Sequence, residues 1–303
     1  MTANPGARLE GDAAVPVYWR TLGLPGLADI HVHFLPEPME RKVWAYFDAG
    51  VEHYGTPWPI RYRNSEGERL DTLRGLGLRA IPALAYAHKP GMAEWLNEWS
   101  ADFAERIPDA VHCATFYPEP GVDEVVERAL SQGARLFKIH VQVGEFAPDD
   151  PLLEPAWARL EPAQVPVVIH AGSAPIPGTY TGPRAVGRLL ERHPRLKLVI
   201  AHMGMPEYHE FADLAEAYVG VHLDTTMAFT DFTSRIAPAP KDYLRRLPGL
   251  VDKVVLGSDF PSIPYPYAHQ IAALARLELG DDWMRAVLWH NGARLLDISR
   301  GYE

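Results

Sequence analysis

Side chains that bind metals or carry protons stand at the ends of several apolar segments of this chain. His31 and His33 close the segment that begins at Leu27. In an extended strand, residues two apart project to the same face, so both imidazoles point to one side. Two imidazoles on one side of a strand end can bind a single divalent cation. Alone, such a pair is more often a surface or core feature than a pair of ligands.

The same pattern recurs later in the chain. Each of these residues also has an ordinary structural explanation: a histidine can be hydrogen-bonded in the core, and an aspartate can cap a turn or a helix. A lysine between apolar neighbours is costly to bury without a partner, which indicates solvent, a carboxylate or a ligand beside it. The groups that follow apolar segments are Lys138, His140, His170, His202 and Asp259.

The spacing of these groups favours one shared site. Lys138, His170 and His202 follow one another at equal intervals, close to the length of about 30 residues that one βα unit occupies. The step from His202 to Asp259 is close to two such intervals, and the step from His33 to Lys138 is close to three. The groups therefore fall on the first, fourth, fifth, sixth and eighth predicted strands. Unrelated structural residues would not be expected to recur at the same place in successive βα units.

The elements that must position these residues alternate between short β-branched runs and longer amphipathic segments. Strands alternating with helices indicate a parallel sheet, and eight strands favour closure into a barrel with its functional groups at the C-terminal mouth. The predicted fold class is α/β, a (β/α)8 TIM-type barrel. We predict strands over 27–33, 78–84, 111–117, 136–141, 165–171, 196–203, 221–226 and 253–258, and helices over 92–106, 122–131, 155–163, 185–192, 205–218 and 243–247.

We expect residues 1–303 to form a single barrel domain, with residues 1–26 as an N-terminal extension. The stretch 36–69 is too long for a plain βα connection and is rich in aromatic residues. It is either an insertion that forms a lid or wall over the barrel mouth, or one that buries its own aromatic rings. Residues 281–298 predict one or two extra C-terminal helices.

Composition and charge exclude several classes of function. The formal net charge of −10 argues against a nucleic-acid-binding or anionic-membrane-binding surface. No uncharged apolar run is long enough for a membrane span, and the N-terminus lacks the order of a signal peptide. The single cysteine, Cys113, fits a reducing compartment. We therefore expect a cytoplasmic protein that acts on a small molecule, and a homodimer is compatible with the sequence.

The motifs resemble those of the amidohydrolase superfamily, in the branch of aminocarboxymuconate-semialdehyde decarboxylase and related lactone hydrolases (amidohydrolase family 2). The resemblance spans roughly residues 27–296. The matching stretches are Asp29-Ile-His-Val-His33, Phe137-Lys-Ile-His140, Val167-Val-Ile-His170-Ala-Gly172, Ala201-His202-Met-Gly204, Gly257-Ser-Asp259-Phe-Pro261 and the closing stretch His290-Asn-Gly-Ala-Arg-Leu-Leu296.

The resemblance implies an enzyme with one divalent metal, held by His31, His33, His170 and Asp259. Three imidazoles and one carboxylate suit Zn²⁺ and leave a position open for water, while Mn²⁺ and Fe²⁺ are also compatible with these ligand types. His202 is then the expected general base or the group that stabilises the charged intermediate, and Asp259 can also accept the water proton.

Lys138 leaves the metal count open. In binuclear members of the superfamily, a carboxylated lysine on the fourth strand bridges two metals. The branch that this chain resembles is usually mononuclear, so we favour one metal. Lys138 and His140 then face the substrate as binders of a carboxylate or phenolate. Tyr117 and Thr225 are further candidates for substrate contacts.

Three functions are considered for these residues. The first is a metal-dependent hydrolase that uses a metal-activated water on a small carboxylated lactone, ester or amide. The second is a non-oxidative metal-dependent decarboxylase of a muconate-type or phenolic acid. The third, a non-catalytic metal-binding or scaffold protein, predicts a missing ligand or base, and none is missing. We favour the hydrolase because hydrolysis is the commoner use of a metal-bound hydroxide.

Overall fold

A computed structural model describes residues 9–298, and the chain divides into two compact units. The first unit contains the residues up to Ile81 together with those from Thr225 onward. The second unit runs from Pro82 to Asp224. The prediction that all 303 residues form one domain therefore stays a prediction, and residues 1–8 of the predicted extension lie outside the described part.

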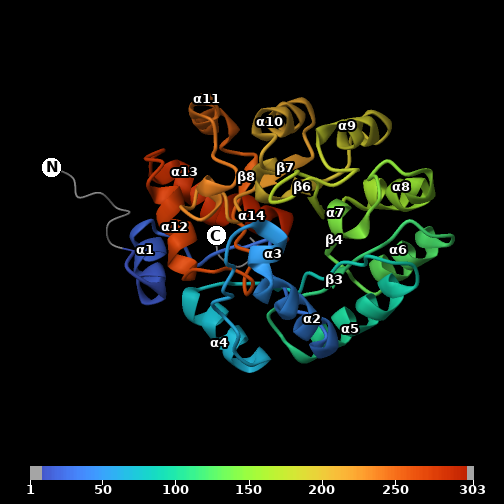
Figure 1. Cartoon of the computed structure of the whole chain (residues 1–303), viewed down its shortest axis with the longest axis horizontal. Coiled ribbons are helices and arrows are strands. Elements are labelled where there is room, and N and C mark those ends of the chain that lie inside the picture. Colours follow the sequence, from blue (N-terminus) through green and yellow to red (C-terminus); the bar gives the residue numbers. More distant parts are fainter. Residues whose placement is uncertain (1–8, 299–303) are drawn as a thin grey trace. The chain divides into compact units, whose positions relative to one another are not determined.

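Parallel strands form the centre of the second unit, coloured from green to yellow in Figure 1. Strands β3 to β7 pair in chain order, which is the parallel arrangement that alternating strands and helices predict. Every residue of these five strands is buried, as expected for a parallel sheet covered by helices. The strands are β2 (Ala110–Val111), β3 (Cys113–Ala114), β4 (Leu136–His140), β5 (Val167–His170), β6 (Leu198–Ile200) and β7 (Val221–Asp224).

The helices of the second unit follow from their apolar periodicity. In α9, the residues at positions 185, 186, 189 and 190 are buried, which is the one-sided stripe of an amphipathic helix. Helices α6 and α8 pack side by side (Figure 1). The helices are α5 (Met92–Arg106), α6 (Val122–Ser131), α7 (Val141–Gly144), α8 (Glu154–Ala163), α9 (Pro183–Arg192) and α10 (Tyr208–Ala217).

The first unit contains the two ends of the described chain. Its helices are α1 (Val15–Thr21), α2 (Glu37–Asp48), α3 (Gly50–Tyr54), α4 (Glu66–Leu76), α11 (Lys241–Leu244), α12 (Tyr267–Ala275), α13 (Asp281–Arg285) and α14 (Asn291–Leu295), and β8 is Val254–Val255. Strand β1 (Ile81–Pro82) spans the point where the chain passes from one unit to the other. The predicted extra C-terminal helices are present as α13 and α14, with a π-helical turn between them.

The first predicted strand, 27–33, is extended but irregular. Two isolated parallel bridges hold it, Leu27 to Leu78 and Val32 to Phe260. The backbone N–H of Ile30 donates to the carbonyl of Leu256 at 2.9 Å, so the segment still runs beside the one that contains β8. The prediction of a regular strand was therefore wrong in form, because the segment exchanges only scattered hydrogen bonds with its neighbours.

The aromatic-rich stretch 36–69 contains α2, α3 and the start of α4. Its indole Trp58 is buried and donates from Nε1 to the carbonyl of Ser262 at 2.8 Å. The ring of Trp58 also packs at 5.2 Å from Phe47 and 4.7 Å from Phe232, measured between centroids. The insertion thus buries part of its own aromatic surface within the first unit, and its role as a lid stays a prediction.

Within residues 9–298, none of the helices combines the length and hydrophobicity that crossing a membrane requires. This agrees with the absence of a long apolar run in the sequence.

Candidate metal centre and active site

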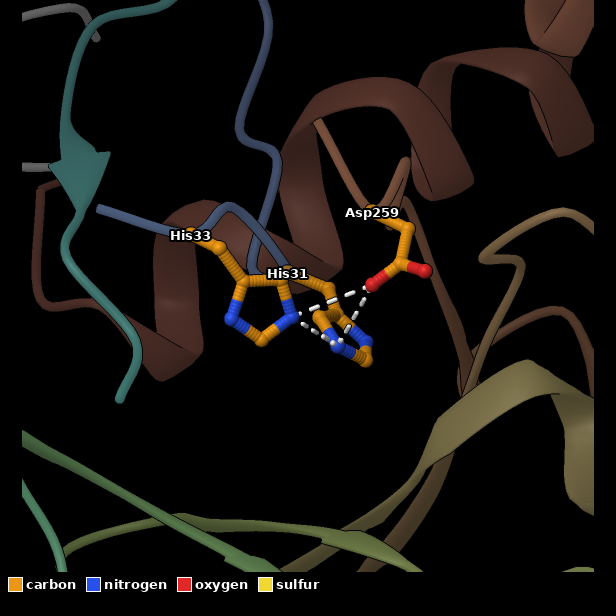
Figure 2. Close-up of side chains that lie close together, drawn as sticks. All are labelled: His31, His33 and Asp259. Atoms are coloured by element: carbon orange, nitrogen blue, oxygen red, sulfur yellow. Dashed lines mark hydrogen bonds and ion pairs between the residues drawn. The ribbon is translucent and has the colours of Figure 1, made fainter. Parts of the chain in front are cut away.

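Three predicted ligands converge in the first unit: His31, His33 and Asp259 (Figure 2). The Nε2 atoms of the two imidazoles lie 3.2 Å apart. Oδ1 of Asp259 lies 3.0 Å from Nε2 of His33 and 3.4 Å from Nε2 of His31. Both histidines are buried, and the carboxylate is nearly so.

Backbone pairing explains this convergence. The N–H of His33 donates to the carbonyl of Phe260 at 2.7 Å, and the N–H of Asp259 donates to the carbonyl of His31 at 2.9 Å. These two bonds hold the end of the first predicted strand against the end of the eighth. Asp259 has a left-handed backbone with φ of 70°, a conformation that aspartate tolerates better than most residues.

The geometry of the three donor atoms fits a bound metal ion. In a tetrahedral zinc site with bonds of about 2.0–2.1 Å, neighbouring donor atoms are ~3.3 Å apart. The three distances between donor atoms seen here, 3.0, 3.2 and 3.4 Å, lie close to that value. A cation among three electron pairs satisfies all of them at once, whereas protons shared among the same atoms satisfy them only in part. The donor set therefore suits a divalent cation.

Three other predicted site residues come together in the second unit. Strand pairing places His140 of β4 directly beside His170 of β5. Their rings stack with centroids 4.0 Å apart, and the ring of His202 lies 4.6 Å from that of His170. The ring of Tyr86 lies 4.9 Å from that of His140. The four predicted metal ligands are thus divided, three in one unit and His170 in the other, and their sharing of one metal stays a prediction.

The ring nitrogens of these histidines have defined neighbours. Nε2 of His170 lies 3.1 Å from the carbonyl oxygen of Ala174, an arrangement in which Nε2 donates and the lone pair stands on Nδ1. Ligation through Nε2 would require this hydrogen bond to open. Nδ1 of His140 accepts the N–H of Val143 at 3.3 Å and so caps α7.

The backbone around His202 is unusual. His202 and Met203 have φ of 57° and 56°, and Gly204 follows with φ of 74°. Non-glycine residues in this region store strain and cluster at functional sites. The N–H of His202 donates to Oδ1 of Asp224 at 2.8 Å, which fixes the turn. The sequence motifs did not single out Asp224 as the residue that anchors His202.

Close packing explains the glycines that follow His170 and His202. A Cβ on Gly204 would lie 2.2 Å from the ring of Phe211, and one on Gly172 would lie 2.4 Å from the carbonyl oxygen of Met205. Both values are far inside van der Waals contact, so only glycine fits. The histidine-then-glycine motifs therefore have a steric cause in addition to their chemistry.

The predicted substrate contacts differ in their surroundings. Lys138 is 1% exposed on β4. Tyr117 is half-buried, its hydroxyl donates to the carbonyl of Gly144 at 3.1 Å, and burial followed by the nearby Glu145 carboxylate raises its pKa. Thr225 is fully buried, and its hydroxyl lies 3.3 Å from the carbonyl oxygen of Gly257 and accepts the N–H of Gly257 at 3.2 Å. These contacts with the backbone of Gly257 give Thr225 a structural role within the first unit.

The structures of other proteins share this fold. An uncharacterised TIM-barrel protein from Bordetella bronchiseptica is 19% identical, with a TM-score of 0.70 over 89% of this chain and 98% of that one. A 5-carboxyvanillate decarboxylase from Novosphingobium aromaticivorans, solved with bound manganese, is 14% identical (TM-score 0.59; 91% and 98% covered). A probable 2-pyrone-4,6-dicarboxylic acid hydrolase from Acinetobacter baumannii is 15% identical (TM-score 0.56; 90% and 99% covered).

These similarities confirm the predicted fold class, an α/β fold of the TIM-barrel type. No curated protein matches the chain in sequence. A sequence model of the amidohydrolases, however, matches residues 28–298 and so includes every strand end that carries a predicted ligand or base. With its converged histidine pair and aspartate, the chain therefore belongs to the amidohydrolase family of metal-dependent enzymes.

Proposed function

We propose that the chain is a metal-dependent hydrolase that uses an activated water to open a small carboxylated lactone, ester or amide. The observation that carries the proposal is the convergence of His31 Nε2, His33 Nε2 and Asp259 Oδ1 within 3.4 Å of one another. Two neutral imidazoles and one carboxylate would hold a divalent cation and would leave room for a further ligand and for water.

We assign the remaining ligand position to His170. A bound metal would supply Lewis acidity and lower the pKa of a bound water toward neutrality. Zn²⁺ is the metal we propose, on the basis of the nitrogen-rich ligand set. The manganese in the Novosphingobium aromaticivorans decarboxylase makes Mn²⁺ the first alternative to test.

We assign proton transfer to His202 and Asp259. Asp224 accepts the backbone N–H of His202 and so holds the backbone of this strained turn in place. We propose that this positions the His202 imidazole to accept a proton. Such a base typically contributes about 10²–10⁴-fold to a rate. The Asp259 carboxylate, already among the ligands, is the second acceptor for a water proton.

Lys138, His140 and Tyr117 are the groups we propose for substrate binding. Lys138 lies buried on β4, and its amine can donate a charge-assisted hydrogen bond to a substrate carboxylate. We propose one metal per chain, with the amine of Lys138 uncarboxylated. A small carboxylated substrate is then bound by charge at one end while its lactone, ester or amide carbonyl faces the water.

Decarboxylation of a muconate-type or phenolic acid is the second candidate. The similarity to the 5-carboxyvanillate decarboxylase favours it, whereas the similarity to the probable 2-pyrone-4,6-dicarboxylic acid hydrolase favours the hydrolase. The ligand set serves both reactions, so the products must decide between them.

The test is a panel of carboxylated lactones, esters, amides and phenolic acids, run with the metal-loaded chain in ¹⁸O-labelled water. Hydrolysis predicts one ¹⁸O atom in the newly formed acid and no CO₂. Stoichiometric CO₂ with an unlabelled product would contradict the hydrolase proposal and support the lyase.

A further inference from the structure

A buried carboxylate, Asp29, is hydrogen-bonded to the backbone of the histidine pair in the first unit. Asp29 is 0% exposed, and its Oδ1 accepts the backbone N–H of His31 at 3.0 Å. This bond fixes the backbone of the very residue that supplies one of the metal donors. Asp29 is therefore bonded to a residue of the donor cluster without belonging to the cluster itself.

The second oxygen of Asp29 connects to the start of α12. Oδ2 accepts the hydroxyl proton of Tyr267 at 2.8 Å, and this ring is also fully buried. Burial, and then the neighbouring Asp29 carboxylate, raise the pKa of Tyr267 well above its usual value. The raised pKa favours the protonated phenol, the form that donates to Asp29.

Two residues from other parts of the first unit hold the first turn of α12. The backbone N–H of Tyr267 donates to the hydroxyl of Tyr62 at 2.6 Å, and the N–H of Ala268 donates to Oδ1 of Asp12 at 2.9 Å. The hydroxyl of Tyr62 donates in turn to Oδ2 of Asp12. These bonds satisfy two N–H groups that a helix leaves without a partner at its N-terminus, where Pro266 offers no side-chain cap.

We propose that Asp12, Tyr62, Tyr267 and Asp29 form a chain of positioning residues that fixes His31 for metal binding. The aromatic-rich insertion supplies Tyr62, and the N-terminal segment supplies Asp12. Two segments outside the repeating βα units thereby set the metal affinity of the site. The inference rests on the proposed metal site and adds the residues that prepare it.

Removal of a positioning residue should weaken metal affinity. A ligand that is held in place before binding loses less conformational freedom when the metal binds. Loss of an outer hydrogen-bond partner in metal sites typically weakens metal affinity by about 10–100-fold. We expect Tyr267→Phe to fall in this range, because it removes only the donor to Asp29 and keeps the ring. Tyr62→Phe acts one bond further away and should cause a smaller loss.

The experiment compares the metal-free wild type, Tyr267→Phe, Tyr62→Phe and a matched control, Tyr208→Phe. Tyr208 is 1% exposed on α10 in the second unit, so its substitution also removes a buried phenol hydroxyl. The dissociation constant for Zn²⁺ is measured by competition with a chelating dye, and the Co²⁺ absorption spectrum reports ligand geometry. Thermal midpoints of the metal-free proteins separate general destabilisation from a change in the site.

The proposal predicts a Zn²⁺ dissociation constant at least about 10-fold higher for Tyr267→Phe than for Tyr208→Phe, with a shifted Co²⁺ spectrum. Equal dissociation constants for these two variants would overturn it. If Tyr267→Phe does not fold, the comparison is made with Tyr62→Phe. Weaker Zn²⁺ binding than in Tyr208→Phe then supports the proposed hydrogen-bonded positioning residues, and equal Zn²⁺ binding overturns the proposal. A wild type that binds no metal would contradict the proposed function itself, which keeps the two failures distinguishable.

Discussion

His33 and Asp259 are separated by 226 positions in the chain, yet Nε2 of one and Oδ1 of the other lie 3.0 Å apart. Their meeting depends on two backbone hydrogen bonds between the strand ends that carry them. The side chains are therefore positioned by the fold of the first unit, and His31 is added to the pair by its place two residues earlier on the same extended segment. Such an arrangement is prepared for a cation before any substrate arrives.

The role assigned to His202 predicts a separation between metal binding and turnover. His202→Ala should keep its metal content and lose turnover by about 10²–10⁴-fold, because it removes a base and no ligand. The matched control is His290→Ala, which removes an exposed imidazole in the first unit. Metal analysis and kcat on the same preparations check this. Loss of the metal in His202→Ala would assign His202 to the ligands instead.

Lys138 distinguishes one metal from two. If the amine binds the substrate carboxylate, Lys138→Met should keep one metal equivalent per chain and raise KM by at least ~10-fold, since a charged hydrogen bond is worth about 1.5–3 kcal/mol. Added bicarbonate should leave the wild-type rate unchanged. Two metal equivalents in the wild type, falling in the variant, together with activation by bicarbonate, would show a carboxylated bridging lysine.

Gly204 makes a prediction about stability. In Gly204→Ala the added Cβ would lie 2.2 Å from Phe211, at a residue whose φ is 74°, so both packing and backbone are strained. The free energy of unfolding should fall by about 1–3 kcal/mol, measured in urea. Gly249→Ala is the control, because its Cβ would meet no atom within 4 Å. Equal unfolding free energies for the two variants would show that the turn relaxes without cost.

Cys113 predicts a dependence of stability on pH. Burial raises the pKa of its thiol to about 12, while the unfolded chain has the ordinary value near 9.0. The unfolded state then releases its proton first, so stability is full below about pH 9 and is lost as pH rises toward 12. The slope is at most ~1.4 kcal/mol per pH unit.

The measurement is urea unfolding at pH 8 to 10.5 for the wild type and Cys113→Ala. Subtracting the variant's curve removes the contribution of the buried tyrosines, which both proteins share. The difference should grow in favour of the variant above pH 9. A native thiol that reacts with a disulfide reagent at pH 8 as fast as in urea would contradict its burial.

The sequence predicted the long amphipathic elements best. Helices α5 and α6 begin and end at the predicted residues, because their apolar periodicity is uninterrupted and glycine precedes each. The predicted strands are longer than the observed ones, since a buried apolar run continues past the last ladder hydrogen bond. Residues 27–33 show this most clearly: the run is apolar and extended, but its hydrogen bonds go to three separate segments.

The site was predictable where it followed the βα interval. Equal spacing assigned His170 and His202 to successive strands, and the structure brings their rings together. The bond between Asp29 and Tyr267 joins residues 238 positions apart and follows no interval. An aspartate two residues before His31 was a visible signal, but its partner depends on how α12 packs, and this packing is a tertiary property.

Metal content tests the role of the His31, His33 and Asp259 cluster: it is measured by mass spectrometry on the purified chain after dialysis, beside Asp259→Asn. We expect one equivalent of a divalent metal per wild-type chain, and less than about a tenth of an equivalent in the variant, since an amide oxygen is a weaker ligand than a carboxylate. Circular dichroism of both proteins confirms equal folding. A variant that retains the full equivalent, or a wild type that takes up no metal on titration, would show that this cluster is not the metal site.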